Sequence, residues 1–148
     1  MGGEDDPVRL FLDANVLFAA AWSPEGRAAA LVRLADLGKC ELLTSPHALA
    51  EADRNLKLKR SRAARRLETE VAPVVTVVAE ATSEAVRVGL ERGLPLKDAP
   101  ILGAALRAGA DMLVTGDARH FGHLYGDTIA GTRVVSPAVA LAGMLELL

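Results

Sequence analysis

The chain has 148 residues, a formal net charge of −2, and 51% hydrophobic but only 3% aromatic residues. This length suits one domain, whose core would consist mainly of Ala, Leu and Val side chains. No apolar run approaches the roughly 18 residues that a membrane-spanning helix requires, and the charge gives no overall indication of a nucleic-acid partner. A single cysteine, Cys40, and the lack of a secretory leader before the first apolar run predict a cytoplasmic protein.

The chain alternates between short branched apolar runs and longer segments with helical spacing. Residues 1–7 are mainly small or acidic, and we expect a flexible tail there, followed by one domain over residues 8–148. The apolar runs predict buried strands at Val8–Leu12, Glu41–Thr44, Val74–Val78, Met112–Thr115 and Arg133–Val135. Strands that alternate with helices indicate the α/β class, with a mostly parallel five-stranded sheet and helices on its faces.

Serine-proline pairs and single glycines predict where the helices begin and end. Ser is a good N-cap and Pro suits the first helical position, so we expect helices to start at Ser23-Pro24, Ser45-Pro46 and Ser136-Pro137. Glycines can adopt the left-handed conformation that ends a helix. The sequence places such glycines at positions 38, 93 and 109.

Acidic side chains follow the predicted strands at the points where a sheet opens to solvent. Asp13 directly follows the first strand and Asp117 follows the fourth, while Glu51 and Asp98 lie near the starts of predicted helices. Ligands of such sheets gather beyond the carboxyl ends of the strands. Carboxylates that share a pocket repel one another unless a cation lies among them, and oxygen ligands suit Mg²⁺ or Mn²⁺. Such a site is suited to phosphodiester hydrolysis.

Four short motifs extend this prediction to a family. The segments "LDANVL", "SPHALAEADRNL", "PLKDAPILGAAL" and "LVTGDARHF" contain the four acids in order. From Val8 to about Ala142 the chain resembles PIN-domain proteins, close to the toxin components of bacterial and archaeal toxin–antitoxin pairs. The resemblance implies a three-layer α/β/α sandwich with a Mg²⁺- or Mn²⁺-dependent ribonuclease site.

The resemblance also implies roles for particular residues. Asp13, Glu51, Asp98 and Asp117 match the acidic quartet of the family, and Asn15 and Thr115 match the neighbours that orient carboxylates or waters. Asp13, Asp98 and Asp117 would hold the metal, directly or through waters, and Glu51 would position or deprotonate the water that attacks an RNA phosphodiester. Many relatives carry a further acid shortly after the fourth one, whereas Ala118, Arg119 and His120 follow Asp117 here, which favours a single metal.

Each of these residues also has a purely structural interpretation. Asp13 and Asp117 could cap short helices, and Glu51 could pair with Arg54 or Asn55 along one helix. Pro100 disfavours a helical conformation at Ala99, which makes Asp98 a natural N-cap. His120 and His123 have no partnering Cys or third His, which argues against a zinc site. His120 could contact phosphate, but we interpret it as a plain surface histidine.

Residues 54–66, "RNLKLKRSRAARR", carry seven basic side chains and no acid. This run is either a solvated helix face or a contact surface for RNA phosphates, and the two interpretations have equal weight. In the second case the contacts would be made by Arg54, Lys57, Arg62 and Arg65.

The resemblance implies partners as well as a substrate. Toxins of this family usually dimerise, and a peptide-like antitoxin segment covers the acidic groove, so we expect a homodimer and a cognate antitoxin that contributes an Arg. The apolar residues of Val16–Trp22, with Leu31, Leu34 and Leu37, would form core and in part a partner surface.

Two other functions remain open at this stage. The chain could be a catalytically silent PIN-fold module that binds RNA or a partner protein. A phosphatase that forms an aspartyl phosphate at Asp13 would also place an acid after the first strand, but Asn15 stands where the second acid of such a D-x-D pattern is expected.

Overall fold

The computed structural model describes residues 6–148, so most of the predicted tail at residues 1–7 lies outside the described residues. The strands are β1 (Val8–Leu12), β2 (Cys40–Thr44), β3 (Val75–Val77), β4 (Met112–Val114), β5 (Thr128–Ile129) and β6 (Thr132–Val135). The α-helices are α1 (Ala14–Trp22), α2 (Arg27–Asp36), α3 (Pro46–Leu58), α4 (Ala63–Arg66), α5 (Ser83–Glu91), α6 (Ala99–Arg107), α7 (Ala118–Phe121) and α8 (Pro137–Glu146). A π-helical turn at Leu67–Val71 and 3₁₀ turns at Ala72–Val74 and Gly122–Leu124 complete the regular structure.

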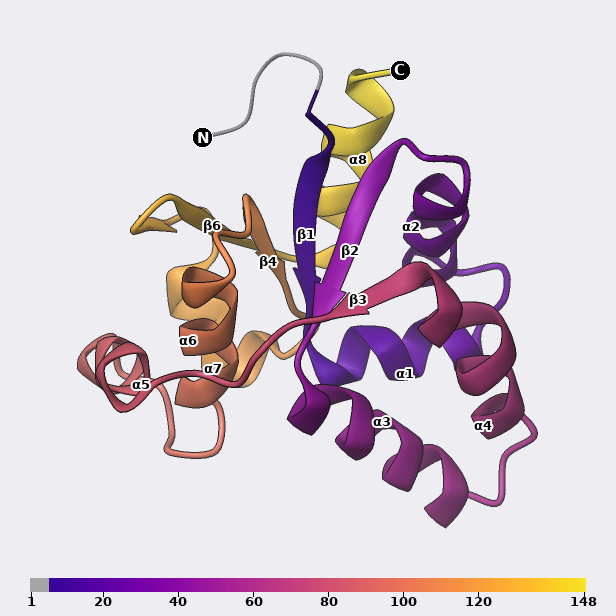
Figure 1. Cartoon of the computed structure of the whole chain (residues 1–148), viewed down its shortest axis with the longest axis horizontal. Coiled ribbons are helices and arrows are strands. Elements are labelled where there is room, and N and C mark those ends of the chain that lie inside the picture. Colours follow the sequence, from indigo (N-terminus) through magenta and orange to yellow (C-terminus); the bar gives the residue numbers. More distant parts are fainter. Residues whose placement is uncertain (1–5) are drawn as a thin grey trace.

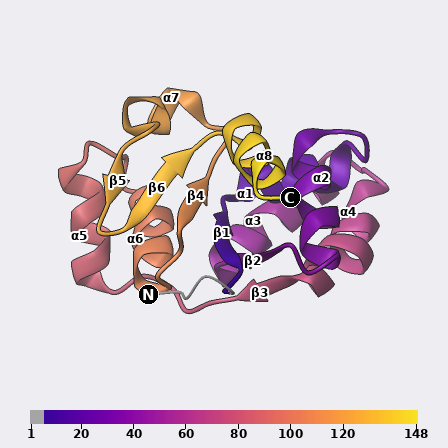
Figure 2. The ribbon, with the colours of Figure 1, turned by 90° about the horizontal axis from the view of Figure 1, so that it is seen from above.

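The strands form one sheet in the order β3-β2-β1-β4-β6-β5. All neighbouring pairs are parallel except β5 with β6. Helices α2 and α8 lie on one face of the sheet, and α5 and α6 lie on the other (Figures 1 and 2). This arrangement confirms the predicted three-layer α/β/α fold.

The sheet has six strands where the sequence predicted five. The additional strand, β5, has only two residues, too few to produce an apolar run. It is joined to β6 by Ala130 and Gly131, whose φ angles of 48° and 89° are both positive. Positive φ at both loop residues is typical of the tight turn that joins two hairpin strands. Ala in the first loop position is not the usual sequence signal for this turn.

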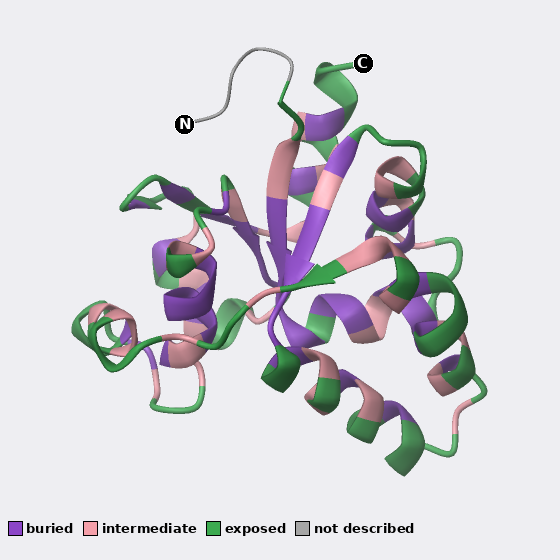
Figure 3. Ribbon diagram, viewed as in Figure 1, coloured by how far each residue is buried: buried purple, intermediate pink, exposed green. Residues whose placement is uncertain are grey.

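The central strand β1 explains why the fold is stable without disulfides. Leu10, Phe11 and Leu12 are fully buried between the helical layers. In Figure 3 the residues of β1 and β2 are buried toward their carboxyl ends, while exposed residues lie in the connecting loops, on β3 and on the outward faces of the helices. Parallel strands covered on both faces have this continuous apolar character, which made them predictable from the sequence.

Two of the three predicted helix starts are correct. The hydroxyls of Ser45 and Ser136 accept hydrogen bonds from backbone N–H groups in the first turns of α3 and α8. Ser23 instead ends α1, and α2 begins only at Arg27 after a turn closed by the bond from Gly26 N–H to the Ser23 carbonyl. The three predicted terminal glycines are confirmed, with φ of 76°, 81° and 67° at positions 38, 93 and 109.

Among residues 6–148, none of the helices combines the length and the apolar character needed to cross a membrane.

Candidate metal-binding active site

The four acids named from the sequence line one cleft of about 580 Å³. The cleft lies beyond the carboxyl ends of the central strands, where α1 and α3 begin just below the arrowheads of β1 and β2 (Figure 1). Asp13 precedes α1, Glu51 lies in α3, Asp98 precedes α6 and Asp117 precedes α7. The lining of the cleft also includes Ala14, Asn15, Phe18, Asn55, Leu58, Lys59 and Lys97. The fold therefore brings together carboxylates that are up to 104 positions apart (13 to 117) in the chain.

Asp13 is held by three hydrogen bonds at the floor of the cleft. Its Oδ1 accepts from the backbone N–H of Ala14 at 2.7 Å, and its Oδ2 accepts from Thr115 Oγ1 at 2.9 Å and Asn15 Nδ2 at 3.0 Å. Thr115 is within reach because β1 and β4 are parallel neighbours with Leu12 opposite Val114. A carboxylate has about four acceptor positions, so one on Oδ1 remains available to a ligand. The capping predicted for Asp13 and its place in the cleft are therefore compatible.

Burial raises the pKa of Asp13 to about 6 from its ordinary value of 3.8. The loss of solvation outweighs the hydrogen bonds from Thr115, Ala14 and Asn15, which act in the opposite direction, and the nearby Asp98 raises the pKa further. The side chain is only 5% exposed. A cation in the cleft would favour the charged form of this carboxyl.

This raised pKa predicts that the free energy of unfolding falls between about pH 4 and pH 6. The unfolded chain loses the Asp13 proton near 3.8 and the folded chain near 6, so the folded state binds more protons in that interval. A shift of about two pKa units corresponds to about 3 kcal/mol, present below pH 4 and lost as the pH passes 6. Urea unfolding of the wild type and of Asp13→Asn across this range would measure it. If the free energies of unfolding of the two proteins differed by the same amount at every pH, the prediction would be contradicted.

Asn15 and Thr115 join the two loops that carry Asp13 and Asp117. Asn15 Oδ1 accepts from the backbone N–H of Gly116 at 2.7 Å, and Thr115 Oγ1 accepts from the N–H of Asp117 at 3.1 Å. The hydroxyl of Tyr125 donates to the Thr115 carbonyl at 2.7 Å and adds a support that the sequence analysis did not identify. The positions predicted for Asn15 and Thr115 thus agree with an orienting role, which stays a prediction.

Asp98 and Asp117 of the cleft form a tight group with His120, which adjoins the cleft without lining it. One potential ligand atom from each lies within 4.8 Å of the other two. His120 Nδ1 is 2.7 Å from Asp117 Oδ2 and 3.3 Å from Asp98 Oδ2. The ring is 24% exposed, so the interpretation of His120 as a plain surface histidine is wrong. His123, by contrast, is exposed and lies with Nε2 2.7 Å from the Arg92 carbonyl.

Asp98 does not cap α6 with its side chain, contrary to expectation. The helix begins at Ala99 despite Pro100, and Asp98 has φ −100° and ψ −25° rather than the extended conformation of most N-caps. Its Oδ2 is fully buried and makes no hydrogen bond within the part of the chain that the structure describes; His120 Nδ1 lies 3.3 Å from it. A buried carboxylate oxygen without a donor is unfavourable unless a cation satisfies it.

The two aspartates of this group differ in pKa. Burial raises the pKa of Asp98, although the charges of Lys97 and His120 act to lower it. Burial also acts to raise the pKa of Asp117, but the hydrogen bonds from the ring and the backbone N–H of His120 outweigh it, and the net pKa is lowered. As the pH falls, Asp98 is therefore protonated before Asp117.

Glu51 faces the same cleft from α3 and is partly exposed. Within residues 6–148 its carboxylate makes no ion pair with Arg54 and no hydrogen bond with Asn55, so the pairing along the helix is not present. Neither Asp13 nor Glu51 belongs to the tight three-residue group within this described range. Glu51 is therefore placed to act on a molecule in the cleft rather than on its own helix.

The basic residues of the cleft differ from those predicted. Lys59 and Lys97 line it, whereas the four predicted phosphate contacts do not. Those four are Arg54, Lys57, Arg62 and Arg65, all exposed. Lys57 is paired with Asp53 at 2.8 Å and borders a separate groove.

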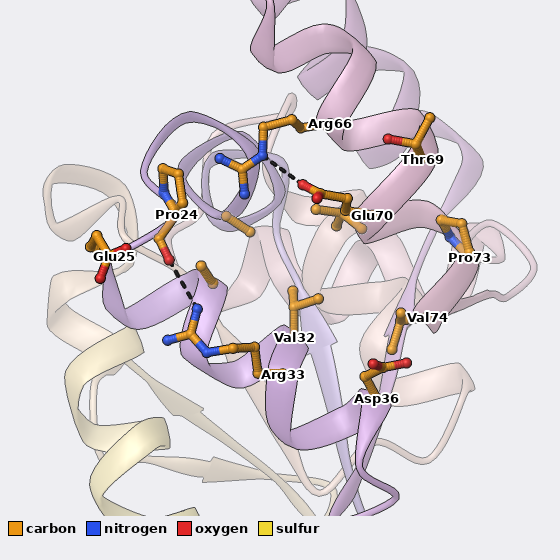
Figure 4. A pocket seen from close by; sticks show the side chains of 13 residues that line it. Pro24, Glu25, Val32, Arg33, Asp36, Arg66, Thr69, Glu70, Pro73 and Val74 are labelled. Carbon is orange, nitrogen blue, oxygen red and sulfur yellow. Dashed lines mark hydrogen bonds and ion pairs between the residues drawn. The ribbon is translucent and has the colours of Figure 1, made fainter.

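A second cavity, of about 570 Å³, lies between α1, α2 and the π-helical turn (Figure 4). Three of its charged side chains are already engaged: Arg66 Nε lies 2.6 Å from Glu70 Oε2, and Arg33 donates to the Pro24 carbonyl at 2.9 Å. None of the four acids lines it. The carboxylate cleft is therefore the better candidate for an active site.

Fold and site together define an α/β/α protein with a carboxylate-lined cleft beyond a parallel sheet. The chain belongs to the PIN domain family, whose sequence profile matches residues 9–119. No curated protein matches the chain significantly.

Several solved structures share the fold. A Pyrobaculum aerophilum protein, PAE2754, is 23% identical, with a TM-score of 0.65 over 94% of this chain and 96% of that one. A toxin–antitoxin complex from Klebsiella pneumoniae contains a chain 20% identical, with a TM-score of 0.58 over 86% and 97%. The sarcin–ricin loop cleaving toxin VapC20 of Mycobacterium tuberculosis is 21% identical, with a TM-score of 0.53 over 76% and 95%. At these identities the likeness concerns the fold.

Proposed function

We propose that this chain is a divalent-metal-dependent endoribonuclease and the toxin of a toxin–antitoxin module. The observation that carries the proposal is the convergence of four carboxylates on one cleft, where the buried Oδ2 of Asp98 has no hydrogen-bond donor among residues 6–148. Membership of the PIN domain family supports a nuclease. The silent-module alternative gains no support from the site, because all four acids are present and share one space.

The donor set fits Mg²⁺ or Mn²⁺. Both ions accept carboxylate oxygens and retain several waters, and the cleft offers such oxygens with space for water. When bound, such an ion stabilises charge on a phosphoryl group and makes water a better nucleophile. Asp98 and Asp117 would hold the cation directly. Asp13 would contribute through the remaining acceptor position of Oδ1 or through a water.

Glu51 is the candidate for the proton acceptor. It faces the aspartates across the cleft from a different helix and has no competing ion-pair partner among the described residues. A carboxylate in that position can orient a water and accept its proton as it attacks the phosphorus. Asn15 and Thr115 would keep Asp13 in place by the bonds described above.

Two similarities support the choice of substrate and partner. One structural relative is described as a sarcin–ricin loop cleaving toxin, and another forms a toxin–antitoxin complex. We accordingly propose a structured RNA as substrate, a cognate antitoxin as protein partner, a homodimer as the assembly and the cytoplasm as the location. An antitoxin Arg would find the carboxylates of the cleft as partners.

Cleavage of a panel of structured RNAs tests the proposal. We expect cleavage with Mg²⁺ or Mn²⁺ that EDTA abolishes, and a loss of about 10²-fold or more in Glu51→Gln, because a positioned base contributes that much to proton transfer. Full metal-dependent cleavage by both Glu51→Gln and Asp98→Asn would place the active site elsewhere. RNA binding without cleavage under any metal would favour the silent module.

The cleft lysines provide a prediction about RNA affinity. Lys59→Ala should weaken RNA binding and reduce the slope of log K against log salt by about 0.7, the value for one contact to a single strand. Lys57→Ala is the matched control, because it lies on the same helix but is paired with Asp53 outside the cleft. Salt-dependent binding by the metal-free protein measures both. If the two variants had equal slopes of log K against log salt, Lys59 would not contact an RNA phosphate in the cleft.

A further inference from the structure

His120 lies where a third ligand beside Asp98 and Asp117 would be. It is in the short helix α7, which begins after Asp117 and contains no acid. The backbone N–H of His120 donates to Asp117 Oδ1 at 3.2 Å, and this bond fixes the first turn of the helix. The same turn directs the imidazole toward both aspartates rather than toward solvent.

The distances among the three groups agree with neighbouring ligands of one ion. Two ligands at right angles, each about 2.1 Å from an octahedral metal, lie about 3 Å apart. His120 Nδ1 lies 2.7 Å from Asp117 Oδ2 and 3.3 Å from Asp98 Oδ2. Two of the three separations are therefore close to the value for neighbouring ligands, and one ligand atom from each group lies within 4.8 Å of the other two. Nδ1 would give up the proton that it shares with Asp117 when it binds a cation. The buried Oδ2 of Asp98, which has no donor, is one of these atoms.

The chemistry of the ring decides which ions such a group prefers. Neutral imidazole has one protonated and one acceptor nitrogen, so Nδ1 can bind a cation while Nε2 carries the proton. Nitrogen ligands favour transition-metal ions, whereas Mg²⁺ prefers oxygen ligands and water. A site with one imidazole and two carboxylates should therefore discriminate between these two classes of ion.

We propose that His120 binds the metal through Nδ1 together with Asp98 and Asp117, and that the cleft consequently selects a transition-metal dication over Mg²⁺. The inference rests on the proposed function in that it concerns the same cleft. The competing possibility is that His120 only orients Asp117 through their hydrogen bond. That role would affect binding of every cation alike, whereas a ligand role would affect the two classes differently.

Metal binding by the RNA-free protein separates these roles, with Mn²⁺ and Mg²⁺ as the probes. We expect tighter binding of Mn²⁺ than of Mg²⁺, and a coupling to an imidazole ¹⁴N in the pulsed electron paramagnetic resonance spectrum of the bound Mn²⁺. His120→Ala should lose the ¹⁴N coupling and weaken Mn²⁺ binding by about 10- to 100-fold, with a much smaller effect on Mg²⁺. His120→Asp, which adds an oxygen ligand, should shift the preference toward Mg²⁺.

The control variant is His123→Ala, because His123 lies three positions away and contacts the Arg92 carbonyl instead of the aspartates. It should retain the coupling and both affinities. The inference would be overturned if the wild type bound no Mn²⁺ or bound it without ¹⁴N coupling. It would also be overturned if His120→Ala weakened the binding of Mn²⁺ and Mg²⁺ equally. If Mn²⁺ bound with ¹⁴N coupling but the protein cleaved no RNA, only the proposed function would be overturned. If His120→Ala kept its Mn²⁺ affinity and its Mg²⁺-supported cleavage, only the inference would be overturned.

Discussion

Asp13→Asn is expected to lower metal-dependent RNA cleavage by at least about 100-fold, the upper range found when only an outer partner of a metal ligand is removed. Asn has nearly the same size and can still accept from the Ala14 N–H, but it has no charge to share with a cation. The side chain is buried at the floor of the cleft, where the Ala14 N–H holds its Oδ1. Single-turnover cleavage with saturating Mn²⁺ measures the effect.

Asp111→Asn is the matched control for Asp13→Asn. Asp111 precedes β4 at the amino-terminal end of the strands, opposite to the cleft, and its Oδ2 accepts from the backbone N–H of Arg9 at 2.8 Å. The same chemical change there should leave cleavage within about twofold of the wild type, because ordinary surface substitutions have small effects. If Asp13→Asn cleaved as well as Asp111→Asn, the buried carboxyl would have no part in catalysis and would serve as a helix cap only.

The main strands were predictable because each is an apolar run long enough to be recognised. Residues 10–12 of β1 are fully buried, and buried parallel strands are short continuous apolar runs whose length separates them from helices. The two-residue β5 could not be found in this way, because its pairing depends on the turn at Ala130 and Gly131 rather than on hydrophobicity. The start of α2 was misplaced because Ser23-Pro24 also suits a turn, and tertiary packing decided between the two.

The acids of the candidate site were predictable from their position after strands and at helix starts. The side chains that complete the cleft were not, because they come from positions without such a signal. Lys97 precedes Asp98 in a loop, and Lys59 lies eight residues after Glu51, at the end of the same helix. His120 could not be recognised from the sequence, because its ring meets Asp98 only when α7 folds close to the loop before α6.

The contact between α5 and α6 also had no sequence signal, yet it lies directly beside Asp98. Gly89 of α5 is buried against Ala99, the first residue of α6. A Cβ atom at Gly89 would lie 2.8 Å from the Cα of Ala99 and 2.9 Å from its carbonyl oxygen, closer than packed atoms approach. Gly103 makes a similar close approach to Ala81 from the other helix. The two helices are in contact only because these positions lack side chains.

Gly89→Ala should therefore destabilise the protein by about 1–3 kcal/mol, the usual range for an overpacked interior, although Ala is the better helix former. Gly143→Ala in α8 is the matched control, because a Cβ there would meet its nearest neighbour, Met112 Cε, at an ordinary 3.9 Å. That change should stabilise the protein by up to about 1 kcal/mol. Urea unfolding of the two variants measures whether their changes in the free energy of unfolding have opposite signs.

Metal affinity connects this contact to the site. The added methyl group can be accommodated only if the start of α6 moves, and Asp98 immediately precedes that start. We therefore expect Gly89→Ala to weaken Mn²⁺ binding as well as folding, while Gly143→Ala leaves Mn²⁺ binding unchanged. If Gly89→Ala lost stability but bound Mn²⁺ as tightly as the wild type, the position of Asp98 would be set by the loop before it and by His120 rather than by the packing of α5 on α6.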